Sequence, residues 1–194
     1  MRNQGPDNLN TAGNVDDDTL RRLEDLSGHA VGSVKSGFAA INEVREGDFV
    51  KVITCGGTAC CSLGKQDSLE LGLKLEDKYY KMALPAKFCI GVCGCSNRCA
   101  EACVRDIGIV GTLGGWNVFV GGCDHTRSTK LLAEEISTPQ VLRLVDKTLK
   151  FYAANAPGGQ LFLEFVESTD YNNFKAAVTG EFKKNCNDEN RQGA

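Results

Sequence analysis

The sequence lacks any apolar run that could cross a membrane. A membrane-spanning helix needs about 20 mostly apolar residues, and the 194-residue chain contains no such stretch. Segment 1–18 is polar and acidic, without the apolar core of a secretory signal. We therefore expect a cytoplasmic protein that makes no contact with a membrane.

Excess positive charge is also missing. The net charge is −3, and no stripe of basic residues with interleaved aromatics occurs. Both observations argue against nucleic-acid binding. Histidine is scarce as well, with only His29 and His125, and of the two His125 is the better candidate for a proton donor.

Cysteine, in contrast, is abundant and clustered. Eight of the ten cysteines fall in two short segments, 55–61 and 89–103. In a reducing compartment, this usage favours metal binding or redox chemistry over a disulfide framework. The missing secretory signal and the local clustering both argue against a secreted disulfide-bonded protein.

Residue periodicity predicts an α+β domain with a small mixed β-sheet flanked by helices. We expect a disordered segment 1–15, a helical segment 16–48, the main domain over 49–182 and a polar tail over 183–194. Predicted strands cover 49–54, 87–93, 107–110 and 116–120. Predicted helices cover 66–79, 128–136, 138–154, 161–166 and 171–178.

Two cysteine pairs have informative spacings. Cys55 and Cys61 are separated by five residues, and Cys95 and Cys99 by three, with each pair in a glycine-containing loop after a predicted strand. Four thiolates that converge from two loops suit an iron–sulfur cluster of the 4Fe-4S type. Zinc is the main alternative, although the five-residue gap fits zinc spacing less well.

The order of motifs resembles the siroheme and iron–sulfur domain of nitrite and sulfite reductases. The resemblance rests on Cys-Gly-Gly-Thr-Ala-Cys-Cys-Ser-Leu-Gly from residue 55, Leu-Pro-Ala-Lys-Phe from residue 84, Gly-Cys-Ser-Asn-Arg-Cys-Ala from residue 94, and Asp-Ile-Gly-Ile-Val-Gly from residue 106. It extends over roughly residues 49–180.

The resemblance implies a cluster bound by Cys55, Cys61, Cys95 and Cys99, with Cys99 also bonded to siroheme iron. It implies a reductase that acts on sulfite or nitrite. Basic residues near the motif loops are candidates to bind the anionic substrate and the siroheme carboxylates. We assign Lys87, Arg98 and Arg105 to catalysis and Lys65, Asn97 and Arg127 to the siroheme, although Asn97 could instead bond the loop backbone.

Two departures from the family pattern keep another function open. Ser96 stands where the family has proline, and Cys89 stands where the family tends to have a positive residue. The alternative is an electron-transfer or redox-sensing module with the cluster alone. No nucleotide phosphate-binding motif is present, so we expect electrons from a separate carrier such as a ferredoxin, and a homo-oligomer could complete the site.

Overall fold

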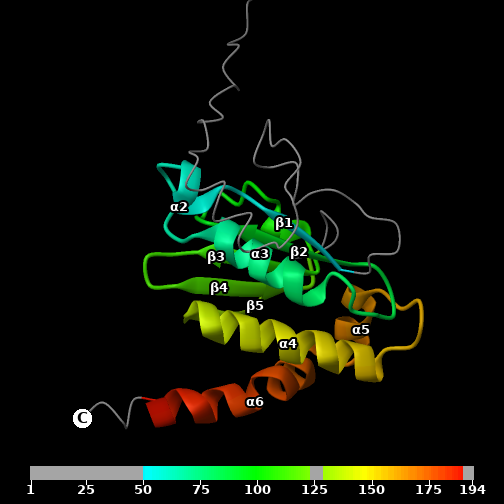
Figure 1. Cartoon of the computed structure of the whole chain (residues 1–194). Helices are drawn as coiled ribbons and strands as arrows, with labels where there is room; N and C mark the ends of the chain where they lie inside the picture. The colour runs from blue at the N-terminus through cyan, green and yellow to red at the C-terminus, as the bar shows by residue number, and fades with distance from the viewer. Residues whose placement is uncertain (1–49, 123–128, 190–194) are drawn as a thin grey trace, which may run out of the picture.

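A five-stranded mixed sheet forms the centre of the structure (Figure 1). The computed structural model describes residues 50–122 and 129–189, with side chains as far as residue 180. The strands lie side by side in chain order: β1 (Val50–Thr54), β2 (Phe88–Cys93), β3 (Ile107–Gly111), β4 (Trp116–Val120) and β5 (Lys130–Ile136). The first three are parallel, and the last two are antiparallel to their neighbours. This architecture confirms the predicted α+β class with a small mixed sheet.

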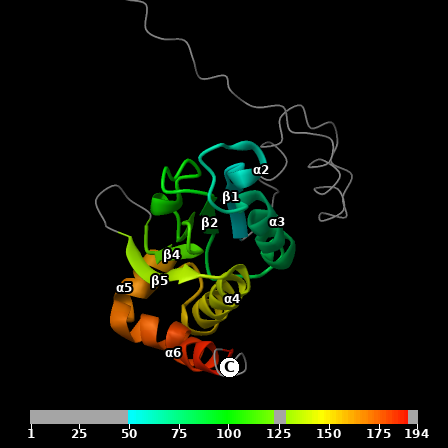
Figure 2. The same ribbon diagram turned by 90° about the vertical axis from the view of Figure 1, so that its left-hand side faces the viewer.

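Helices cover one face of the sheet. The longer helices are α3 (Ser68–Tyr79), α4 (Thr138–Asn155), α5 (Phe162–Ser168) and α6 (Tyr171–Glu189). On this face the β2 side chains Phe88, Ile90 and Val92 are buried in the main hydrophobic core, together with residues of α3 and α4. Helix α6 lies on the outer side of α4, where Phe174 contacts three other aromatic rings (Figure 2).

The loop between β2 and β3 covers part of the opposite face. It includes one turn of 3-10 helix, η2 (Ala102–Val104). Ala102 packs directly on Gly91 and Gly108, where a Cβ atom at Gly108 would lie 1.9 Å from the carbonyl oxygen of Ala102. The alternation predicted for β2 is confirmed, because Cys93 faces this loop while Val92 faces the helices.

The prediction of a helix over 128–136 is wrong, because residues 130–136 form strand β5. Buried Leu132 and Ile136 are four residues apart, a spacing typical of a helix face. A regular strand also places residues four apart on one face. Here Glu134 between them is exposed, because shifts in register against β4 interrupt the two-residue alternation, and Glu135 has a φ of 50°.

The other predicted elements are present with modest changes in their bounds. Helix α6 continues to Glu189, well beyond the predicted end at residue 178, and so includes part of the predicted polar tail. A short helix, α2 (Gly57–Cys60), lies within the first cysteine loop. The predicted segments 1–15 and 16–48 lie outside the described residues.

Candidate iron–sulfur centre

The two cysteine loops meet at one edge of the sheet. Because β1 and β2 are parallel, the loops that follow them leave from the same edge. Cys55 comes directly after β1, and Cys95 comes two residues after the end of β2. The backbone N–H of Cys55 still donates to the carbonyl of Val92, at 3.1 Å, so the first cysteine is fixed against the neighbouring strand.

Gly94 joins the two loops through its backbone. Its carbonyl accepts hydrogen bonds from the N–H groups of Lys65 and Gln66, at 2.8 and 3.1 Å. Its own N–H donates to the sulfur of Cys55 at 3.2 Å. A Cβ atom at position 94 would lie 2.6 Å from the Cα of Gly57, which is too close for any side chain. Glycine is therefore needed here for the two backbones to approach.

The sulfur of Cys55 has several hydrogen-bonding neighbours. Besides the Gly94 N–H, the hydroxyl of Ser68 lies 3.3 Å away, and that hydroxyl also contacts the Cys55 carbonyl at 2.8 Å. A hydrogen bond with Cys93 is the main cause that lowers the pKa of Cys55 to about 5, and burial opposes it. The structure therefore stabilises a thiolate at Cys55, the form that binds metal.

The other three predicted ligands lie around the same edge. Cys95 is buried, whereas Cys61 and Cys99 are exposed. Burial raises the pKa of Cys99, and the nearby thiols of Cys55, Cys95 and Cys61 raise it further. The Cys99 thiol therefore lies within electrostatic range of the other three thiols, and their joint role as ligands stays a prediction.

The donor set fits an iron–sulfur cluster. It consists of thiols, the ligands that clusters use, and backbone N–H groups contact the sulfurs of Cys55 and Cys93. Over the described residues, no three His, Cys, Asp or Glu side chains are close enough to share a single metal ion. A cubane attaches its four thiolates to four different iron atoms, so its ligands are not required to converge on one point.

Two of the predicted arginines lie on the sheet face that carries the cysteine loop. Arg98 has a φ of 57° and places its guanidinium over the ring of Phe119, 5.4 Å from the centroid. Arg105 forms an ion pair with Glu101, and its Nε is buried without a hydrogen-bond partner among the described residues. Both arginines are therefore near the loop, but Arg105 is partly neutralised by Glu101.

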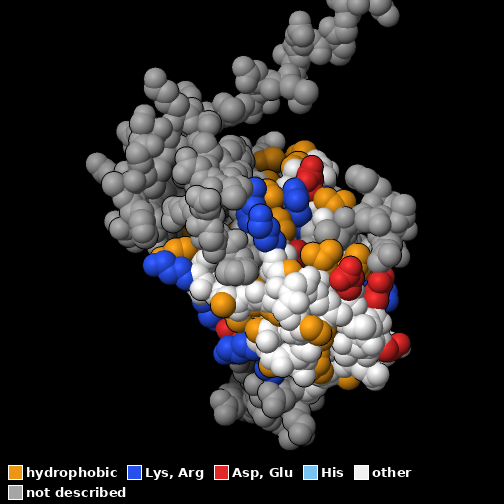
Figure 3. All heavy atoms as spheres, turned by 90° about the vertical axis from the view of Figure 1, so that its right-hand side faces the viewer, with side chains coloured by type: hydrophobic (Ala, Val, Ile, Leu, Met, Phe, Trp, Pro, Cys, Tyr) orange, Lys and Arg blue, Asp and Glu red, His pale blue; other side chains and the backbone are white. Residues whose placement is uncertain are grey.

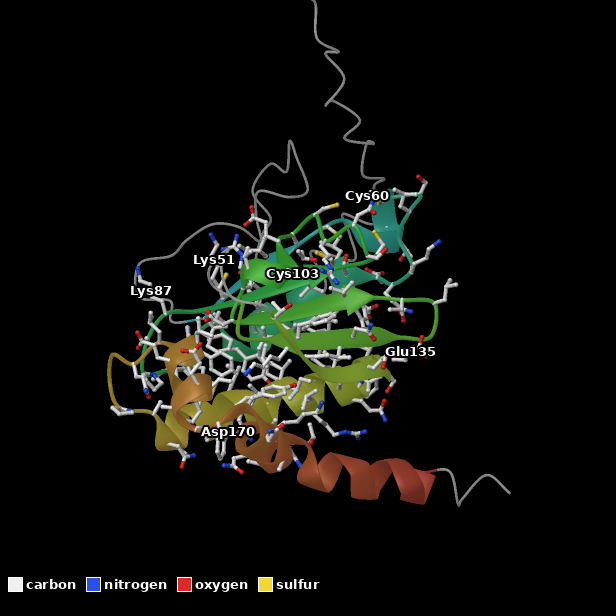
Figure 4. The ribbon with its side chains drawn as sticks, turned by 180° about the vertical axis from the view of Figure 1, so that it is seen from behind. Lys51, Cys60, Lys87, Cys103, Glu135 and Asp170 are labelled. Atoms are coloured by element: carbon white, nitrogen blue, oxygen red, sulfur yellow. The ribbon has the colours of Figure 1, made fainter. Side chains whose placement is uncertain are left out.

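The remaining predicted residues are more dispersed. Lys87 is exposed just before β2, at the end of the strand opposite to Cys95, and Figure 4 shows it far from Cys60. Lys65 and Asn97 have exposed side chains in the two cysteine loops. Arg127 lies outside the described residues, as do Cys123 and His125. The roles assigned to these residues stay predictions.

Sequence reasoning missed Lys51 as a candidate. Lys51 is paired in register with Cys89, so both side chains lie on the same face of the sheet as the cysteine loop. Lys51 and Lys87 occupy the same end of the molecule (Figure 4), where Figure 3 shows basic side chains grouped beside hydrophobic ones. The alternation of residues 50–54 could have indicated that Lys51 shares a face with Cys55.

Asp106 is a second residue that the sequence did not single out. It is 8% exposed, and its carboxylate accepts a hydrogen bond from the N–H of Cys89 at 2.7 Å. Burial raises the pKa of Asp106 to about 6, against the opposing effects of the Cys89 N–H and of Arg105. A carboxyl group with this pKa can exchange a proton near neutral pH. Nothing in the sequence around residue 106 indicated that the side chain would be buried.

Comparison with known proteins identifies the family. The family model described as "Nitrite and sulphite reductase 4Fe-4S domain" matches residues 46–186. The chain belongs to this family. The match supports the cluster over the zinc alternative, because the family is defined by its 4Fe-4S domain. Residues 55–61 and 95–99, which hold the four predicted ligands, all fall within the matched region.

Named relatives of this reductase family are reductases of sulfite or nitrite. The chain is 40% identical over 131 residues to an assimilatory-type sulfite reductase of Nitratidesulfovibrio vulgaris. The aligned region covers 66% of this chain and 60% of that protein. It is 37% identical over 105 residues to the large subunit of the NADH nitrite reductase of Escherichia coli, over 53% of the chain and 12% of that protein. The chain thus spans only part of the length of each relative.

A solved structure supports the fold. The crystal structure of dissimilatory sulfite reductase I superposes with a TM-score of 0.61 over 70% of this chain and 53% of that chain. The sequences are 14% identical, so this likeness concerns the fold alone. No helix in the described parts of the chain has the length and apolar character needed to cross a membrane.

Proposed function

We propose that this chain is the catalytic module of a siroheme-dependent reductase that acts on sulfite or nitrite in the cytoplasm. Cys55, Cys61, Cys95 and Cys99 would hold the 4Fe-4S cluster, and Cys99 would also ligate the siroheme. When bound, the two cofactors would supply the electrons for a multi-electron reduction. The single observation that carries the proposal is the meeting of the two cysteine loops at the edge shared by β1 and β2.

The exposure of the cysteines supports the role of Cys99. Cys95 is buried and Cys55 is half-buried, so these two sulfurs face the protein. Cys99 is exposed at the tip of the loop, beside Arg98. An exposed thiol with a neighbouring arginine is suited to contact a second cofactor that carries carboxylates.

The sheet face beside the cysteine loop supports an anionic ligand. Lys51, Arg98 and Arg105 lie on or next to this face. Arginine and lysine side chains bind carboxylates and small oxyanions through charge-assisted hydrogen bonds. Asp106, whose pKa is raised to about 6, lies next to Arg105 and can hold a proton near neutral pH. The chain thus offers anion-binding groups on this face, and a proton-holding group at the end of the sheet opposite to the cysteine loops.

One observation favours a second candidate function. Position 89 carries a cysteine, and Lys87 lies at the end of β2 opposite to the cysteine loops. With fewer basic groups close to the cluster, the chain could act as an electron-transfer or redox-sensing module without siroheme. In both cases the electrons would come from an external donor such as a ferredoxin, and a second copy could complete the site.

Anaerobic purification after expression with a siroheme supply distinguishes the two candidates. The reductase proposal predicts a tetrapyrrole absorption spectrum together with iron and acid-labile sulfide. It also predicts turnover of sulfite or nitrite with a strong one-electron donor. Iron and sulfide without a tetrapyrrole, and without turnover, would instead support the electron-transfer module.

A further inference from the structure

Two exposed leucines lie in loops at the edge of the sheet where the two cysteine loops meet. Among the described residues, four large hydrophobic side chains are exposed, namely Leu63, Leu113, Leu131 and Leu161. Leu63 belongs to the first cysteine loop and is 55% exposed. Leu113 belongs to the turn between β3 and β4 and is 87% exposed. Exposed apolar side chains that gather beside a functional site indicate an interaction surface.

The turn between β3 and β4 is held directly against the first cysteine loop. The side-chain amide of Gln66 donates a hydrogen bond to the carbonyl of Thr112, at 2.8 Å. A Cβ atom at Gly111 would lie 2.9 Å from the Cβ of Gln66. Gln66 follows Leu63 by three residues, and Thr112 directly precedes Leu113. The two leucines therefore flank one contact between the loops, and we refer to Leu63 and Leu113 as the leucine surface.

The leucine surface lies beside the candidate cluster site. Leu63 comes two residues after Cys61, a predicted ligand that is itself exposed. Figure 4 shows Cys60, of the same loop, at one end of the molecule together with Glu135, whose carboxylate lies against Gly114 in the β3–β4 turn. Electrons pass between proteins faster over shorter distances. A redox partner that sits on the leucine surface therefore has a short path to the cluster.

The charged groups near the leucine surface favour an acidic partner. Lys65 is exposed two residues from Leu63, and Arg98 is exposed in the second cysteine loop. Of the nearby carboxylates, Asp67 caps helix α3 and accepts the N–H of its third residue, and Glu135 lies on the far side of the β3–β4 turn. Charges at the rim steer association, while apolar side chains at the centre supply affinity. A centre of two leucines suits the small interfaces of redox partners, which bury less than about 1,200 Å².

We propose that the leucine surface is the docking site for an acidic iron–sulfur protein that reduces the cluster of this chain. The two leucines pack against apolar side chains of the donor, and Lys65 and Arg98 face its carboxylates. One electron passes from the donor to the cluster, so the donor is oxidised by one electron and the cluster is reduced by one. This inference rests on the part of the proposed function in which the chain holds a cluster and receives electrons from an external donor. It does not require siroheme.

The test measures the second-order rate constant for reduction of the cluster in the anaerobic full-length protein. The probe is a purified plant-type 2Fe-2S ferredoxin in its reduced form, an acidic donor of low potential. Its paramagnetic signal differs from that of a 4Fe-4S cluster, so rapid freezing follows both proteins. For the double variant Leu63→Ser and Leu113→Ser we expect a rate constant lower by about tenfold. For Glu135→Gln we expect a rate constant about twofold higher at low salt, because a carboxylate that repels the donor is removed.

Two controls separate docking from damage to the cluster. Reduced methyl viologen is a small donor that needs no docking surface, so its rate constant should be the same in all variants. Leu161→Ser is the matched control, because Leu161 is also an exposed leucine, at 49% exposed. It is the N-cap residue of α5, which Figure 1 shows far from α2 and the first cysteine loop. Its replacement should leave the ferredoxin rate unchanged.

Several outcomes would overturn the docking site. One is an equal ferredoxin rate in the double variant and the unmodified protein. Another is an equally large loss of rate with methyl viologen, because the substitutions would then have damaged the cluster. A third is an unmodified protein that methyl viologen reduces and ferredoxin does not. A concentration-dependent dimer that the double variant abolishes would assign the surface to a second copy of this chain instead.

The outcomes also separate this inference from the proposed function. A protein that binds the cluster but no tetrapyrrole would contradict the reductase proposal, while the ferredoxin rates of the variants could still be compared. Absence of iron and sulfide from the unmodified protein would overturn both. A tetrapyrrole spectrum with turnover, combined with an unchanged ferredoxin rate in the double variant, would overturn only the docking site.

Discussion

At the scale of single residues, the four predicted cluster ligands differ in their environments. Cys55 is the ligand whose thiolate form is stabilised by its neighbours, since the Gly94 N–H and the side chains of Ser68 and Cys93 surround its sulfur. Cys61 and Cys99 are exposed. The sequence spacing predicted which cysteines would share a site, but it contained no information about which sulfurs would receive hydrogen bonds, because those depend on the β1–β2 register.

Replacement of Cys95 tests the ligand set. We expect Cys95→Ser to lose most of its bound iron and sulfide, because a serine hydroxyl is a poor substitute for a thiolate ligand in a cluster. Iron and acid-labile sulfide per chain are measured after purification without air. Cys103→Ser is the control and should retain both. A full complement of iron in Cys95→Ser would show that the ligand assignment is wrong.

The raised pKa of Asp106 predicts that the folding stability depends on pH. Its pKa is raised to about 6 in the folded protein, so the folded state binds the proton more tightly than the unfolded state, whose aspartate pKa is about 3.9. The stabilisation is complete below about pH 4 and is lost as the pH rises through about 6, with a total change of about 3 kcal/mol. The neighbouring groups are the Cys89 N–H, Arg105 and Tyr152.

The variant Asp106→Asn isolates this effect, because asparagine can still accept the Cys89 N–H but does not titrate. Relative to the unmodified protein, we expect this variant to become more stable as the pH rises from about 4 to about 7, by up to about 3 kcal/mol. Thermal unfolding of both proteins, followed by circular dichroism at each pH, gives the difference. A difference that does not change with pH would refute the raised pKa.

At the scale of secondary-structure elements, most of the sheet could be predicted and β5 could not. Strand β2 alternates cleanly, so its two faces were correctly predicted. In β5 the buried Leu132 and Ile136 are four residues apart, a spacing that shares one face in both a helix and a strand, and the exposed Glu134 between them breaks the strand alternation. Only the pairing with β4 decides between strand and helix for this segment. The local periodicity of a sequence contains no information about such a pairing with another segment.

The sequence also did not indicate on which face of the sheet the cysteine loop would pack. The connection from β1 to β2 runs through α3 on one face, whereas the connection from β2 to β3 packs on the other face. Both connections step in the same direction across the sheet, so they have opposite hands. Right-handed connections make up about 98% of such crossovers, so general rules would have placed both connections on the same face.

Gly94 provides a prediction about how the loops fit together. In Gly94→Ala the added methyl group would lie 2.6 Å from the Cα of Gly57 and 2.7 Å from the carbonyl oxygen of Gln66. The two loops would have to separate, at a cost of about 1–3 kcal/mol or more. We expect a lower midpoint in urea unfolding and less bound iron.

Gly158→Ala is the matched control for Gly94→Ala, because a Cβ atom at position 158 would meet nothing within 4 Å. This variant should retain both the stability and the iron content of the unmodified protein. Equal behaviour of the two variants would show that the close approach at Gly94 is not needed for the cluster site.

At the scale of the whole molecule, the helices on one face form the core, and the opposite face presents the cysteine loop. The aromatic side chains of α4, α5 and α6 pack with Phe88 beneath the sheet. Lys51, Arg98 and the exposed Cys99 lie toward the other side. The division between a structural face and the face proposed to bind the cofactors follows from the alternation within the strands, which places the two sets of side chains on opposite sides.

The central claim is that this chain binds a 4Fe-4S cluster linked through Cys99 to siroheme. The most direct measurement is the optical and paramagnetic-resonance spectrum of the anaerobic full-length protein, recorded with and without sulfite. We predict tetrapyrrole absorption bands that shift when sulfite is added, together with a cluster signal after reduction. A cluster signal with no tetrapyrrole bands and no response to sulfite would contradict this account.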